Sequence, residues 1–333
     1  MSPTDCHLAP EAKRDEEIWF EDGNIIIVAG DTAFRLYKGI LSAASLVFKD
    51  LFSVPQPEDG ETMDNCPVIR LPDPATDLRH FFRAVTKPDF SHLRHDYKPA
   101  FGMLAAVCRI GHKYQADEVV DAAASRIENF FARWPSTAAT IISKNRGRMP
   151  LTWELFWWAH NRLCPTAVEI QDAFEAVGLA RLLGRPSILP FALYLCCAGD
   201  PLHMRDGVPR PDGAVSRLSS EDYLRCIQAI PKLRAACSDK IRSVLARSMT
   251  ASVLSDCTNG GQCAEVFEMM HRDFIEEKYV PVVTDLFASI RFLRTKPVAY
   301  TTYYLCLCSR CVLRLDVIEY GGEAAFLTKV FEL

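Results

Sequence analysis

Cysteines in the last third of the chain have the side chains and the spacing best suited to metal chemistry. Cys308 and Cys311 form a C-x-x-C pair, and Cys257 and Cys263 are separated by five residues. Four thiolates can hold zinc in a tetrahedral site, and His271 is a further candidate ligand. The C-x5-C spacing is looser than in most zinc sites.

The alternative is that these cysteines are packing residues. Free cysteine is among the most buried residue types and often behaves as a small hydrophobic side chain. Cys306 and Cys308 lie in the apolar run YYLCLCSRCVL. We therefore expect core packing, no metal ligand and no cofactor, and we leave open whether Cys257, Cys263, Cys308 and Cys311 hold zinc.

The sequence offers no candidate site for catalysis. His271-Arg272-Asp273-Phe274 imitates a kinase catalytic loop, but Lys278 occupies the position of the required Asn. We interpret it as a solvated helix face. The sequence also contains no G-x-S-x-G elbow and no H-E-x-x-H helix. We therefore expect no catalytic residue and no enzymatic activity.

Composition limits the partners and the compartment. A formal net charge of -4 gives no basic footprint for nucleic acid. The longest apolar run, 188–198, is too short to span a membrane. Thirteen cysteines without an apparent secretory signal favour reduced thiols in the cytoplasm or the nucleus.

The elements before these cysteines begin with a hairpin. Ile25 to Val28 is a β-branched run typical of a strand buried on both faces, and 33–37 alternates as a second strand. The apolar period then changes to about 3.6 over 41–52, which predicts two short helices broken near Ser45. We expect Phe34, Leu41 and Phe48 to share one core with a residue of a later strand, Leu71.

The flanking segments complete a small α+β domain. Residues 1–16 are expected to be a disordered tail, followed by a short strand at 18–20. A third strand is predicted at 68–71, and helices at 78–85, 101–111 and 116–134.

From residue 135 onward the pattern is almost wholly helical. A helix over 151–163 is rich in tryptophan, and 200–217 is the longest expected loop. Ser219 and Asp222 have the spacing of a capping box, ahead of an expected kink at Pro231. Further helices are predicted at 264–278 and 280–293.

The order of elements over residues 17–134 resembles the BTB/POZ domain. The positions that keep the family spacing are Phe34, Lys38, Ile40, Leu41, Ser45 and Phe48, with Tyr37 where the family usually has His. Motifs such as FEDGN and PQP resemble the BTB proteins expanded in mushroom-forming fungi. The implied organisation is a tail (1–16), a BTB/POZ domain (17–134) and a helical region (135–333).

The resemblance implies binding to proteins: to a second copy, to cullin-3 or to transcriptional corepressors. In repressor-type members an Asp before the first core strand pairs with a basic residue and forms a charged pocket. The corresponding residues here are Asn24 and Lys38, so the acid of this pocket is missing. Cullin adaptors carry a hydrophobic residue and an acidic residue, two positions apart, after the helix that corresponds to 78–85. Residues 86–89 here supply the acid, Asp89, without the hydrophobic residue. We expect a non-catalytic interaction module, either a cullin-3 ligase adaptor or a scaffold without a ligase role, whose partner specificity lies mostly in residues 135–333.

Overall fold

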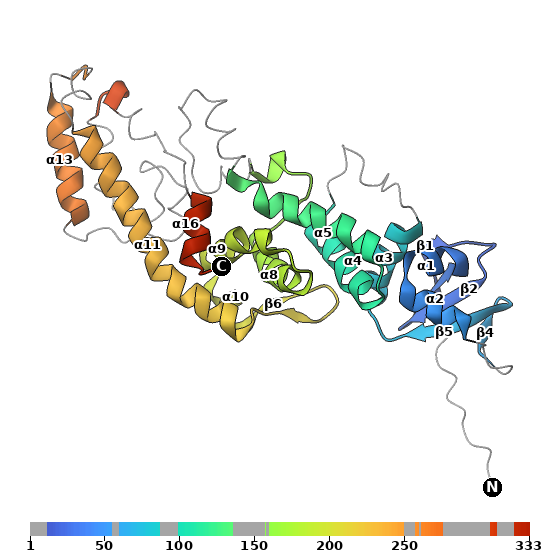
Figure 1. Ribbon diagram of the computed structural model, residues 1–333. Coiled ribbons are helices and arrows are strands. Elements are labelled where there is room, and N and C mark those ends of the chain that lie inside the picture. Colours follow the sequence, from blue (N-terminus) through green and yellow to red (C-terminus); the bar gives the residue numbers. More distant parts are fainter. Residues whose placement is uncertain are drawn as a thin grey trace, which may run out of the picture. The chain divides into compact units, whose positions relative to one another are not determined.

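The computed structural model describes residues 12–54, 60–86, 99–135, 157, 160–249, 257–259, 261–275, 307–311 and 323–333. Contacts divide the chain into an N-terminal unit, residues 1–127 and 209–214, and a helical unit, residues 128–208 and 215–333. The division at Ile127 lies inside α5 (Asp117–Ala132), a few residues before the predicted boundary. Figure 1 shows the elements, which mix α and β structure as expected.

The N-terminal unit contains a five-stranded sheet of order β1-β3-β2-β5-β4, larger than the three strands predicted. Its members are β1 (Lys13–Trp19), β2 (Ile25–Ala29), β3 (Thr32–Leu36), β4 (Thr62–Met63) and β5 (Cys66–Leu71). Strand β2 lies at the centre, antiparallel to β3 and parallel to β5, so that Ile27 pairs with Phe34 on one side and Ile69 on the other. All five residues of β2 are buried, which confirms the prediction for this run.

Strand β1 corrects the expected tail, because residues 13–16 belong to the sheet. The buried Asp15 accepts hydrogen bonds from the backbone N–H of Glu17 and Ile18 at 3.0 and 2.8 Å. Arg79 of α3 (Ala75–Thr86) donates to the same carboxylate at 2.6 Å, and Arg83 pairs with Glu17. Long-range ion pairs therefore fix a segment whose composition alone indicates disorder.

The helix break predicted at Ser45 is present. It separates α1 (Lys38–Ala44) from α2 (Leu46–Ser53). Ser45 is the N-cap of α2, because its hydroxyl accepts from the N–H of Phe48 at 3.1 Å. The same hydroxyl donates to the carbonyl of Tyr114, so the break is also tied to the end of α4 (Phe101–Lys113).

One hydrophobic core fills the space between this sheet and its helices. Phe34, Leu41 and Phe48 are buried in it, and Leu71 packs against it, so the predicted grouping is confirmed. Phe48 stacks on Tyr114 with ring centroids 4.7 Å apart.

The helical unit is built around α9 (Leu189–Ala198), which is buried over most of its length. Around it lie α8 (Ala173–Leu182), α11 (Ser220–Ser248) and α16 (Glu323–Val330). The apolar run at 188–198 thus supplies the central helix of this helical unit. None of the helices in the described ranges combines the length and the apolar character needed to cross a lipid bilayer.

The expected loop at 200–217 contains regular structure instead. Asp200 caps α10 (Pro201–Asp206), and β6 (Val208–Pro209) pairs with β7 (Val215–Ser216). Helix α11 runs continuously through Pro231. Helix α13 (Gln262–Ile275) confirms the helix predicted at 264–278 as far as the described residues extend. The helix predicted at 280–293 and most of the one at 151–163 lie outside the described residues.

Candidate metal centre

The four cysteines singled out from the sequence come together in the helical unit. Cys257 precedes α13, Cys263 lies in the first turn of that helix, and Cys308 and Cys311 belong to the segment 307–311. Their four Sγ atoms all lie within 4.8 Å of one another. The residue types and the C-x-x-C spacing are visible in the sequence, but the approach of the two pairs depends on the tertiary fold.

Hydrogen-bond donors of the backbone face these sulfurs. The N–H of Cys308 donates to Cys263 Sγ at 3.2 Å, and the N–H of Asn259 donates to Cys257 Sγ at 3.4 Å. Hydrogen bonds from Thr258 lower the pKa of the Cys308 thiol to about 5, against the opposing effect of burial. Hydrogen bonds from Asn259 and Gly261 lower the pKa of Cys257. The cluster therefore stabilises thiolate at two of its four positions.

The other two cysteines are set deeper. Burial raises the pKa of Cys263 and of Cys311, whose side chains are fully enclosed. Both belong to a hydrophobic core between α11 and α13, whose buried members among the described residues are Ile241, Leu245, Cys263, Val266, Phe267, Met270, Leu307 and Cys311. The thiol cluster thus has an enclosed side in this core and a half-exposed side at Cys257 and Cys308.

The remaining sequence candidates lie elsewhere or are not described. His271 is on α13, eight residues after Cys263, and is not part of the sulfur group. Asp273 is buried, so the prediction of a solvated face is wrong for this residue, whereas Arg272 is exposed. Cys306 lies outside the described residues.

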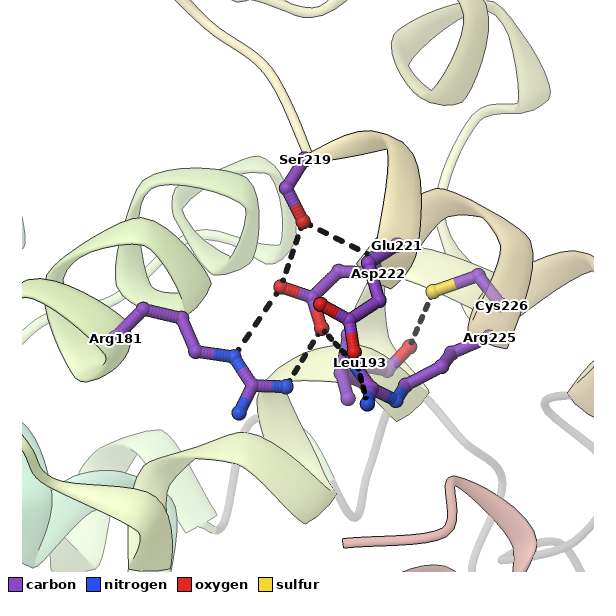
Figure 2. Close-up of polar contacts among 7 residues, drawn as sticks. All are labelled: Arg181, Leu193, Ser219, Glu221, Asp222, Arg225 and Cys226. Atoms are coloured by element: carbon purple, nitrogen blue, oxygen red, sulfur yellow. Dashed lines mark hydrogen bonds and ion pairs between the residues drawn. The ribbon is translucent and has the colours of Figure 1, made fainter.

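A second polar site lies at the N-terminus of α11, where Figure 2 shows several side chains around Asp222. Ser219 caps the helix by accepting from the Asp222 N–H at 3.1 Å, which confirms the predicted helix start. The buried Asp222 carboxylate accepts from Arg181 of α8 at 2.7 Å and from Arg225 at 3.1 Å. Nearby, the Cys226 thiol contacts the Leu193 carbonyl of α9. Arg181 was missed from the sequence, because no spacing rule links it to a residue on another helix.

This second site is a structural junction rather than a reaction centre. Burial by itself raises the pKa of Asp222, but hydrogen bonds from Arg181, Ser219 and Arg225 outweigh it and hold the pKa below its ordinary value. The carboxylate is therefore ionised at neutral pH and fully occupied by donors. It joins α8 to α11.

No known protein family, no curated protein and no solved structure matches this chain. The class of the protein rests on the order of its elements and on the geometry of its sites.

Proposed function

We propose that this protein is a non-catalytic protein-interaction module whose N-terminal unit is of the BTB/POZ type. The observation that carries the proposal is the order of its elements. A β-hairpin is followed by two short helices, a strand parallel to the first hairpin strand, and three longer helices.

The residues behind the resemblance have roles that agree with this class. Phe34, Leu41 and Phe48 are buried in one core, so the spacing that these positions share with the family places them on the packed side of their elements. Ser45 caps the second short helix and so explains why a small hydroxyl side chain stands at the break. Each of these positions serves the architecture, which leaves the outer faces for binding.

The residue that replaces the pocket acid has a different task here. Asn24 Oδ1 accepts the N–H of Lys38 at 2.8 Å, at the first residue of α1. Its side chain is thereby engaged in capping a helix rather than in neutralising a lysine. This supports binding through surfaces other than the charged pocket of repressor-type members.

Two partner classes remain within the proposal. As an adaptor, the N-terminal unit would bind cullin-3 while the helical unit holds a target for ubiquitin transfer. As a scaffold, the protein would associate with itself or another protein without a ligase. The cullin-contact segment beyond Thr86 lies outside the described residues, and no contact in the described part favours one class.

Size-exclusion chromatography with light scattering on the full chain, alone and mixed with purified cullin-3, tests the proposal. Co-elution with cullin-3 supports the adaptor, and a stable dimer without cullin-3 binding supports the scaffold. A chain that stays monomeric and does not bind cullin-3 contradicts the adaptor and the self-associating form of the scaffold.

Point substitutions are needed to locate the residues that determine which partners are bound. Removal of 135–333 would also delete 209–214, which belong to the N-terminal unit. Leu224 and Ile227 of α11 are exposed by 55% and 45%, so Leu224→Asp with Ile227→Asp changes the helical surface without opening a core. We expect this pair to alter the set of captured proteins, and Gln228→Asp on the same exposed face to leave it unchanged.

A further inference from the structure

We propose that Cys257, Cys263, Cys308 and Cys311 bind one structural zinc ion, which holds the segment 307–311 against α13. The four sulfurs lie within 4.8 Å of one another. This inference is independent of the proposed interaction function. It departs from the sequence-based expectation that these cysteines only pack.

The distances fit a single tetrahedral ion. Zinc–thiolate bonds of about 2.3 Å require sulfur–sulfur edges of about 3.8 Å in a regular tetrahedron. An upper limit of 4.8 Å for every pair means that contraction by at most about 1 Å per edge closes the site around an ion. Side-chain torsions can supply such a shift without moving the backbone of α13.

The donor set selects the kind of metal. Four thiolates are soft ligands, which favour zinc or iron over calcium, magnesium or manganese. An iron–sulfur cluster would spread its cysteines over several irons and hold their sulfurs farther apart than a single ion does. Four protein ligands also leave no open coordination position, which is typical of a structural zinc site and not of a catalytic one.

The surroundings of the sulfurs also suit a metal. Four thiolates around Zn²⁺ carry excess negative charge, which neighbouring N–H donors reduce. The N–H groups of Cys308 and Asn259 already point at Cys263 Sγ and Cys257 Sγ. The enclosed Cys263 and Cys311 belong to the core, and the partly buried Cys257 and Cys308 pack against it, so that all four thiols converge on one point.

A metal at this place would have a clear structural effect. Cys263 and Cys308 are 45 residues apart in the chain, and the core beneath them joins α11, α13 and the segment 307–311. A metal shared by segments so far apart in the chain links them directly, and its binding free energy adds to that of folding. Zinc would therefore fix the end of α11, the start of α13 and the segment 307–311 as one folded piece.

Elemental analysis and X-ray absorption on the purified full chain test the proposal. We expect one zinc per chain, with four sulfur neighbours at about 2.3 Å. Replacement by Co²⁺ should give the intense visible absorption of a tetrahedral tetrathiolate complex. Iron in place of zinc, a coordination shell with fewer than four sulfurs, or a metal-free chain with free thiols or disulfides would each overturn the proposal.

Variants separate zinc binding from simple loss of packing. Cys308→Ser and Cys311→Ser should lower the zinc content to well below one per chain, while Cys237→Ser, a buried cysteine of α11 outside the cluster, should leave it unchanged. If the cluster variants fail to fold, hydrogen exchange on the wild type with a chelator replaces them. We then expect protection to fall in 241–249, 261–275 and 307–311 but to persist in β2 and β3. Equal protection with and without zinc would refute the structural role.

Discussion

The buried Asp222 at the start of α11 provides the sharpest test of how the helical unit is held together. Asp222→Asn keeps the size of the side chain but removes the charge that three donors share. We expect the helical unit to lose stability at neutral pH. The N-cap bond from the Asp222 N–H to Ser219 is retained, so the helix start itself is not removed.

The size of the expected loss of stability follows from the exposure of Asp222 and Arg181. Breaking a buried ion pair commonly costs about 3–5 kcal/mol, because one charge is left without its partner. Here the side chain of Asp222 is 3% exposed but that of Arg181 is 42% exposed, so water screens the arginine that remains. Asparagine can still accept one hydrogen bond. We therefore expect a loss of about 2 kcal/mol, close to the value of one charged hydrogen bond.

The stabilisation that Asp222 provides depends on pH. The pKa of Asp222 is lowered in the folded protein, so its contribution is present above the unfolded value of about 3.9 and is lost as the pH falls through the folded pKa. The difference between wild type and Asp222→Asn should therefore shrink on acidification. Below the folded pKa the wild-type carboxyl is protonated and resembles the amide.

Urea unfolding followed by tryptophan fluorescence measures this difference, because four of the five tryptophans belong to the helical unit. The matched control is Glu221→Gln, one residue earlier, whose exposed carboxylate pairs with Arg225 and should contribute less than about 1 kcal/mol. Equal losses for the two variants, or a loss at Asp222 that is the same at pH 7 and pH 3, would refute the reasoning.

Three further predictions concern the N-terminal unit. Phe48→Ala empties a fully buried site and should cost about 3–5 kcal/mol in urea unfolding, whereas a loss below about 1 kcal/mol would contradict the packing described. Gly23→Ala should lower the melting temperature, since its Cβ would lie 2.8 Å from the Leu36 carbonyl oxygen; Gly39→Ala, which meets nothing within 4 Å, should not. Arg79→Met should speed amide exchange in β1 but not in β2, because it removes the ion pair to Asp15; unchanged exchange in β1 would show that this pair does not hold the strand.

The part of the fold that local patterns specify was predictable. The run Ile25 to Val28 and the change of period after Lys38 gave the hairpin, both short helices and the break at Ser45. These features depend on neighbours in the chain and on capping chemistry. A strand was predicted at 18–20, but the first part of β1, residues 13–16, was missed because its order comes from Arg79 and Arg83, more than sixty residues away.

The candidate site was predictable in its components but not in its assembly. The spacing of Cys308 and Cys311 was visible, yet the identical residues also suit a hydrophobic core. The decisive observation is the distance between this pair and the pair Cys257 and Cys263, which α13 and the segment 307–311 bring together. No pattern along the chain encodes a distance of that kind.

The composition of β1 has a consequence for how the N-terminal unit behaves at high concentration. Among the described strands this one pairs with β3 alone and lies at one edge of the sheet, and five of its seven residues are charged. An edge of this kind resists the addition of a strand from another chain, since each added strand would bring charge against charge or bury it. Strand exchange and cross-β aggregation are therefore disfavoured at this edge, and any self-association of the unit should not use strand addition to β1.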